Sequence, residues 1–227
     1  MQISNETFDI LKNFAMINPS IVLSPGNVLQ TVAPSKNIMA KAIIKDAFPL
    51  AGAIYDLHRF LGVVSLFEDP AFDFSARDVT IRGKQNSVNY TFAEPSMIIT
   101  PPDDKQITVN NPDVEIDVDW SKLSNVLKAA NVLQVPEISL TSTKDGVVSL
   151  KAIDSKNPSA DEYKEELGTY NEIEYNFIFK TETFKMMSAD YNVKINKQGI
   201  SQFTSKSEDS PKLTYWIAVE QHSTYGG

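Results

Sequence analysis

Hydrophobic and polar positions at the start of the chain follow first a helical spacing and then an extended one. Ser4 and Asn5 form a helix start signal, and the apolar positions behind them recur at helical spacing: Phe8, Leu11, Phe14 and Ala15. An apolar run at 21–23 then leads through turn residues at 24–27 into a second apolar run at 28–29. This segment therefore predicts a helix followed by a hairpin.

The same unit of helix, strand, turn and strand recurs in looser form further along the chain. In the second copy Asp56 caps a helix, and strands at 72–74 and 79–81 flank a turn near Asp78. The apolar face of this helix is formed by Leu57, Phe60, Leu61 and Val64. A second helix and a second hairpin are therefore expected in the first half of the chain.

Two further copies follow in the second half. Asp119 caps a helix whose apolar face is formed by Trp120, Leu123, Val126, Leu127 and Ala130. Strands at 138–140 and 147–150 flank a turn at 144–146. The fourth copy begins with a short helix from Thr181 or Thr183 through Phe184 and Met187, followed by a strand at 191–195, a turn at 197–199 and a strand at 200–203.

Proline-rich turn signals gather between the second and third copies, from Pro95 to Pro112. We place an interdomain connector at 101–112, between an N-terminal domain at 1–100 and a C-terminal domain at 113–227. Further strands are expected at 38–44, 51–55, 172–179 and 213–219. The predicted fold class is α+β, with two pseudo-equivalent domains that each hold two helices and mainly antiparallel strands.

Charge changes this picture through its placement. The chain has 227 residues and a net charge of -8, which argues against binding nucleic acid with the whole surface. Past their first turns, however, the predicted helices carry only basic charges, with Asp9 nearest to an exception. These basic residues are Lys12, Arg59, Lys122, Lys128 and Lys185. The segregation predicts a helical surface that presents cations to a phosphate backbone.

The helix propensity of lysine and arginine explains any one of these residues equally well. The recurrence in all four copies favours the functional interpretation. Few and scattered cations also suit a contact that is electrostatic, blind to sequence and weak enough to slide.

Two acidic segments have a simpler interpretation. The four carboxylates of Asp113, Glu115, Asp117 and Asp119 alternate, which places them on one side of a strand. No glycine-containing calcium-loop spacing surrounds them, and one of them is used as a helix cap. We interpret them, and the acidic loop at 161–166, as solvated faces that discourage unwanted pairing of strand edges.

The residue types that catalysis requires are sparse. The chain has no cysteine, and its two histidines, His58 and His222, lie in different halves. No nucleophile elbow, phosphate-binding glycine loop or histidine pair is present in the sequence. Carboxylates distant in sequence can still converge, and that alternative stays open. We expect no enzymatic activity, no metal and no cofactor.

The apolar runs are also too short for a bilayer, which requires roughly 20 residues in a helix. The start, Met1 to Asn5, lacks a basic segment followed by an apolar one, so no secretory signal is expected. The expected compartment is the cytoplasm.

Two runs in the first third of the chain carry a family resemblance. They are Leu11-Lys12-Asn13-Phe14-Ala15 with Ile17-Asn18, and Ala53-Ile54-Tyr55-Asp56-Leu57 with Phe60-Leu61-Gly62 and Ser65-Leu66. At these residues the sequence resembles the DNA polymerase sliding clamps of T-even-type bacteriophages. The likeness continues more faintly through the third helix and the ending at 215–220.

The resemblance implies a homotrimeric ring of two-domain subunits, with helices lining the hole and sheets on the outside. Such a ring encircles double-stranded DNA without regard to sequence and tethers the replicative DNA polymerase. An ATP-dependent clamp loader places it on DNA in the infected host cell, and in those phages it also supports late transcription. The DNA-facing residues would be Lys12, Arg59, Lys122, Lys128 and Lys185, with His58 as an addition.

The resemblance also implies two protein-binding surfaces. Partners of such clamps insert a hydrophobic peptide into a cleft near the domain connector, where the candidates are Met97, Ile98, Ile99, Ile107 and Val109. Simple packing of the connector explains these residues equally well. For subunit contact, an edge strand with Tyr90 and Phe92 would pair with a neighbour near Tyr163 and Tyr170.

Two other classes of protein stay open. A virion structural or assembly protein would explain an acidic, cysteine-free chain rich in strands, but not the recurring basic helices. An acidic mimic of DNA would place carboxylates on the helices, whereas this sequence has lysines there.

Overall fold

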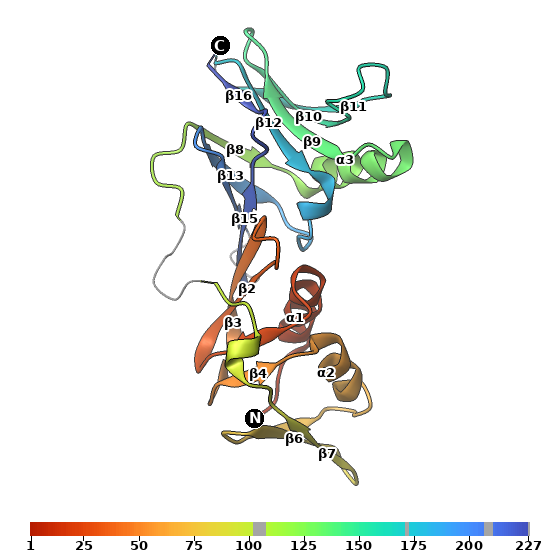
Figure 1. Cartoon of the computed structure of the whole chain (residues 1–227), viewed down its shortest axis with the longest axis vertical. Coiled ribbons are helices and arrows are strands. Elements are labelled where there is room, and N and C mark those ends of the chain that lie inside the picture. Colours follow the sequence, from red (N-terminus) through yellow and green to blue (C-terminus); the bar gives the residue numbers. More distant parts are fainter. Residues whose placement is uncertain (102–107, 171–172, 207–210, 227) are drawn as a thin grey trace. The chain divides into compact units, whose positions relative to one another are not determined.

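The computed structural model describes residues 1–101, 108–170, 173–206 and 211–226 (Figure 1). The chain divides into two compact units, one formed by 1–106 and 207–215 and the other by 107–206 and 216–227. The division between the units falls within strand β15 (Lys212–Ala218), so the polypeptide returns to unit 1 before it ends in unit 2.

The described residues of unit 1 form two α-helices and three antiparallel groups of strands. The helices are α1 (Asn5–Ile17) and α2 (Leu57–Val64), and a 3₁₀ helix η1 spans Pro95–Met97. β1 (Ile21–Leu23) pairs with β4 (Gly52–Ile54). β2 (Gly26–Val32) pairs with β3 (Ile38–Phe48), and β15 is the next strand beside β3. A separate sheet has the order β5 (Ala71–Phe74), β6 (Asp78–Arg82) and β7 (Ser87–Thr91).

Where unit 2 is described it has one α-helix, α3 (Trp120–Leu133), and a 3₁₀ helix η2 (Thr181–Thr183). One antiparallel group consists of β8 (Val114–Val118), β13 (Tyr191–Asn196) and β14 (Ile200–Ser205), with β15 beside β14. A five-stranded sheet has the order β11 (Tyr163–Thr169), β10 (Val147–Ile153), β9 (Glu137–Ser142), β12 (Tyr175–Lys180) and β16 (Thr224–Tyr225).

Each unit forms its core by covering sheets with the apolar faces of its helices. In unit 1 α1 packs on β3, and Ile10, Leu11 and Phe14 are fully buried. In unit 2 α3 packs across β9, β10 and β11, and it buries Leu123 and Val126 (Figure 1). The helical spacing in the sequence therefore predicted the buried faces of these helices correctly.

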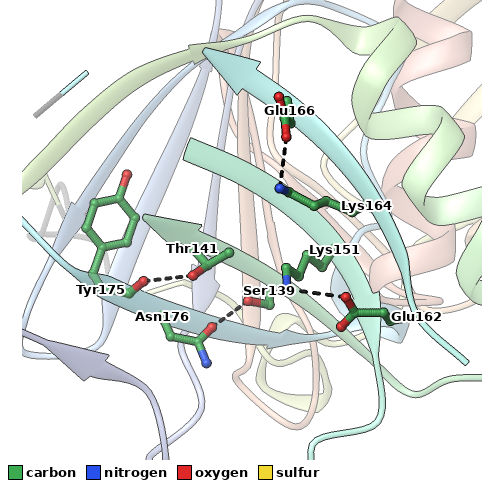
Figure 2. Close-up of polar contacts among 8 residues, drawn as sticks. All are labelled: Ser139, Thr141, Lys151, Glu162, Lys164, Glu166, Tyr175 and Asn176. Carbon is green, nitrogen blue, oxygen red and sulfur yellow. Dashed lines mark hydrogen bonds and ion pairs between the residues drawn. The ribbon is translucent and has the colours of Figure 1, made fainter. Parts of the chain in front are cut away.

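The five-stranded sheet has a polar face on the side that α3 does not cover. There Thr141 donates a hydrogen bond to the carbonyl oxygen of Tyr175, and Ser139 donates to Asn176 (Figure 2). No described helix is both long and apolar enough to cross a membrane.

Three of the four predicted hairpins are confirmed. β5 pairs with β6, β9 with β10 and β13 with β14. The first prediction is wrong, because β1 pairs with the more distant β4 and β2 pairs with β3. The acidic segment predicted as a loop is also different, since β11 begins at Tyr163 and pairs with β10.

The predicted fourth helix is wrong as well. Only the 3₁₀ helix η2 forms, and no helix covers Phe184 to Met187. The ring of Phe184 instead lies 5.7 Å from that of Phe179 and 5.9 Å from that of Phe203, so side-chain packing outweighs the local helical spacing.

Candidate functional site

The candidate site in unit 1 is the exposed face of α1 and α2. α1 begins at the cap Ser4, whose hydroxyl accepts a hydrogen bond from the backbone N–H of Thr7 at 3.2 Å. The carboxylate of Asp46 accepts hydrogen bonds from both the N–H and the hydroxyl of Ser4. Partial burial would raise the pKa of Asp46, but these hydrogen bonds lower it below its ordinary value.

Lys12 lies on the exposed face of α1, but its charge is not isolated. Its ammonium lies 2.9 Å from the carboxylate of Asp9, and both side chains are more than half exposed. Asp9 is the residue that the sequence marked as nearest to an exception. The exposed face of α1 therefore presents a paired cation rather than a free one.

α2 carries the more available cation of unit 1. Its cap Asp56 accepts a hydrogen bond from the N–H of Arg59 at 2.8 Å, which fixes the first turn. On α2 the side chain of Phe60 is buried, whereas those of His58 and Arg59 are exposed. Among the described residues the guanidinium of Arg59 forms no ion pair, so it can meet an anionic partner directly.

The candidate site in unit 2 is the exposed face of α3. Lys128 is exposed and forms no ion pair within the described ranges. Lys122 is half-buried instead, and its ammonium donates a hydrogen bond to the carbonyl oxygen of Glu166 at 2.7 Å. The two lysines of α3 therefore have different surroundings, although the sequence treats them alike.

The start of α3 is fixed by a residue that the sequence did not indicate. Asp119 occupies the cap position but its side chain makes no capping hydrogen bond. The carboxylate of Asp190 accepts a hydrogen bond from the N–H of Trp120 at 2.7 Å in its place. The prediction that Asp119 caps this helix is therefore correct in position and wrong in chemistry.

Lys185 does not lie on a helix. It is half-buried after η2 and lines a pocket of about 900 Å³. Three other basic residues, Lys156, Lys180 and His222, also line this pocket. Glu137, buried at its edge, accepts a hydrogen bond from the N–H of Ser155 and lies 3.3 Å from His222.

The candidates for a partner-peptide cleft are divided between the two units. In unit 1 Met97 is 62% exposed and Ile99 is 46% exposed, whereas Ile98 is buried. In unit 2 Val109 is buried, and its N–H donates a hydrogen bond to Gln202. Ile107 lies outside the described residues.

The candidates for a subunit interface lie at the last strand of a sheet in each unit. In unit 1 the hydroxyl of Tyr90 on β7 donates to the carbonyl oxygen of Asp56, and Phe92 follows the strand. In unit 2 Tyr163 begins β11, and Tyr170, 47% exposed, follows it. Both strands end their sheets, although the sequence predicted an edge strand only around Tyr90 and a loop at the start of β11.

The alternating carboxylates line one face of β8, as predicted. Glu115 lies 3.4 Å from Lys194, and Asp117 lies 2.6 Å from Lys206. The hydrogen bond from Lys206 lowers the pKa of Asp117. Within the described ranges no group of acidic or histidine side chains could hold a metal ion.

Solved structures with the same architecture define the class of fold. The chain matches the PCNA of A. fulgidus, solved with the C-terminal region of FEN-1, with a TM-score of 0.71 at 12% identity over 96% of both chains. It matches the beta clamp of H. pylori with a TM-score of 0.72 at 12% identity, over 97% of this chain and 65% of that longer one. The chain therefore has the DNA-clamp fold.

Sequence comparison defines the family. Residues 4–100 match the family described as DNA polymerase processivity factor, and residues 115–221 match gp45 sliding clamp, C terminal. The sliding clamp of Enterobacteria phage T4 is 30% identical over 99% of both chains, and that of Vibrio phage KVP40 is 29% identical over 97% of this chain and 99% of its own. The chain belongs to the sliding clamps, the DNA polymerase processivity factors of these phages.

Proposed function

We propose that this chain assembles into a homotrimeric ring that encircles double-stranded DNA and tethers a replicative DNA polymerase in the infected bacterial cell. An ATP-dependent clamp loader would supply the energy for placing it on DNA, so the chain needs no enzymatic activity of its own. Late-transcription factors are a further class of partner. Membership of the sliding-clamp family supports this proposal.

The single observation that carries the DNA-binding part is the exposure of unpaired cations on helices of an acidic chain. Arg59 on α2 and Lys128 on α3 are exposed and form no ion pair among the described residues. Lys12, Lys122 and Lys185 would add positive charge nearby, with Lys12 weakened by Asp9. Phosphates attract such cations without reading sequence, which is the contact that a sliding ring requires.

Two further surfaces belong to the same proposal. The partner peptide would contact Met97 and Ile99, the exposed members of the predicted cleft, and Ile98, Ile107 and Val109 would complete or support it. The β7 edge with Tyr90 and Phe92 would pair with the β11 edge of a neighbour, which Tyr163 and Tyr170 flank.

A primer-extension assay with the cognate polymerase and loader tests the proposal. The variant R59E/K128E reverses the two unpaired helix cations and should shorten the products severalfold at moderate salt, because their attraction to phosphate becomes repulsion. The matched control is K36E/K144E, which changes the net charge equally at two exposed turn residues. Equal product lengths from both variants would contradict the DNA-facing role.

A further inference from the structure

The edge strand β11 is tied to α3 by a group of polar side chains. The ammonium of Lys122 donates to the carbonyl oxygen of Glu166 at 2.7 Å, and the amide of Asn125 donates to the carboxylate of Glu165 at 3.1 Å. The hydroxyl of Tyr163 donates to the same carboxylate oxygen at 2.7 Å. We name these five residues the α3–β11 clasp.

The chemistry of the clasp keeps Glu165 charged. The hydrogen bond from Tyr163 lowers the pKa of Glu165 most, followed by the bond from Asn125 and the nearby charge of Lys122. The same bond raises the pKa of Tyr163, so the phenol remains a donor. Hydrogen bonds to an ionised carboxylate are stronger than neutral ones, although exposure to water moderates them.

β11 needs such support because its sequence specifies its register weakly. Leu167 is its one aliphatic residue, and all seven of its residues are exposed or half-buried. Its pairing with β10 shifts register between Val148 and Ser149, opposite Gly168 and Glu166, so a bulge lies directly beside the clasp. Strands without a buried apolar face slip easily, and contacts from a helix prevent this.

Two surface ion pairs lie on the other face of β11 and at the residue that precedes it. Lys151 lies 3.4 Å from Glu162, and Lys164 lies 2.9 Å from Glu166 (Figure 2). Exposed pairs of this kind contribute little to stability. The contacts with α3 therefore add side-chain restraints from a second element to the backbone pairing of β11 with β10.

The second edge of the chain has a simpler attachment of the same kind. On β7 the hydroxyl of Tyr90 donates to the carbonyl oxygen of Asp56 at 3.2 Å, and its ring lies 5.1 Å from that of Phe60. In each unit the last strand of a sheet is thus held by the helix that carries an unpaired cation. Each of these strands leaves one row of backbone groups without a strand partner within the described residues.

We propose that the α3–β11 clasp presets the β11 edge for pairing with the β7 edge of a second copy of this chain. This inference rests on the proposed ring. Lys122 and Asn125 are positioning residues for subunit assembly, acting through Glu165 and Glu166. The unpaired edges in each chain differ, so head-to-tail pairing uses both, which is the kind of interface from which a closed ring can be built.

The test variant is K122M/N125L, which removes both donors of α3 and keeps the aliphatic bulk. Sedimentation equilibrium should find subunit dissociation constants raised about tenfold or more, since a lost hydrogen bond to a charged group has this order of effect. Amide hydrogen exchange in β11 should become faster while exchange in β9 is unchanged. The milder variant Y163F, which lacks a single hydroxyl, should change both measurements in the same direction.

The matched control is K197M/N131L, which makes the same two replacements at exposed residues elsewhere in unit 2. Neither side chain makes a hydrogen bond to another described residue, so subunit association should be unchanged. If K122M/N125L associates as tightly as the wild type, or if the control loses as much subunit affinity, the clasp has no role in assembly. Either result would leave the proposed ring itself untouched. A wild-type chain that stays monomeric would overturn the proposed ring itself.

Discussion

The two units present their helices differently, although each contributes the same kind of surface. In unit 1 α1 pairs its cation with Asp9, and α2 leaves Arg59 available. In unit 2 the helix α3 divides the two tasks along its length, since Lys122 holds a strand and Lys128 stays exposed. A basic residue on an exposed helix is therefore not by itself a nucleic-acid contact, because its acceptor within the protein decides its role.

The largest expected effect tests whether the two cores are equally important for the fold. Phe14 is fully buried in α1, and Leu123 is 1% exposed in α3. F14A should destabilise the protein by about 3–5 kcal/mol and L123A by about 2–5 kcal/mol, because each leaves a cavity. Denaturant unfolding of both variants measures the difference, and a loss below about 1 kcal/mol in either would contradict the burial described.

An intermediate effect is expected from the cations of unit 1. K12M should weaken DNA association less than R59M, because Asp9 already neutralises Lys12. Each lost phosphate contact should reduce the slope of log affinity against log salt by about 0.9. Salt-dependent binding to nicked circular DNA after loading measures both slopes, and a steeper loss for K12M than for R59M would reverse the assignment.

The smallest expected effect concerns the start of α1. The pKa of Asp46 is lowered in the folded protein, so its stabilising contribution is present above the unfolded value of 3.8 and is lost as pH falls through the folded value. Wild type should therefore exceed D46N in stability at pH 7, and the gap should narrow as the pH falls below about 4. Thermal unfolding across this range measures the gap, and a gap independent of pH would exclude the charge as its cause.

Local sequence patterns predicted the elements that depend on local contacts. The apolar faces of α1, α2 and α3 and three hairpins with short turns were all visible in the sequence. Pairing between distant segments was not visible in the sequence. β1 pairs with β4, for example, although two other strands lie between them along the chain. Register across long sequence separations depends on packing that no short window contains.

The same limit applies to the candidate site. The basic helix residues were found by their spacing, but their acceptors come from elsewhere in the chain. Asp190, which caps α3, is 70 residues from Trp120 in the sequence. Glu166, whose carbonyl oxygen accepts the hydrogen bond from Lys122, is 44 residues from that lysine. Lys185 was misplaced because Phe184 packs into an aromatic cluster instead of continuing a helix.

The division of β15 between the units has a consequence for protein synthesis. Residues 207–215 belong to unit 1, yet the ribosome makes them after nearly all of unit 2. Residues 1–106 of unit 1 therefore lack their last segment while the intervening hundred or so residues are synthesised and fold. Premature termination of translation within β15 would leave both halves of the newly made polypeptide without their final strand.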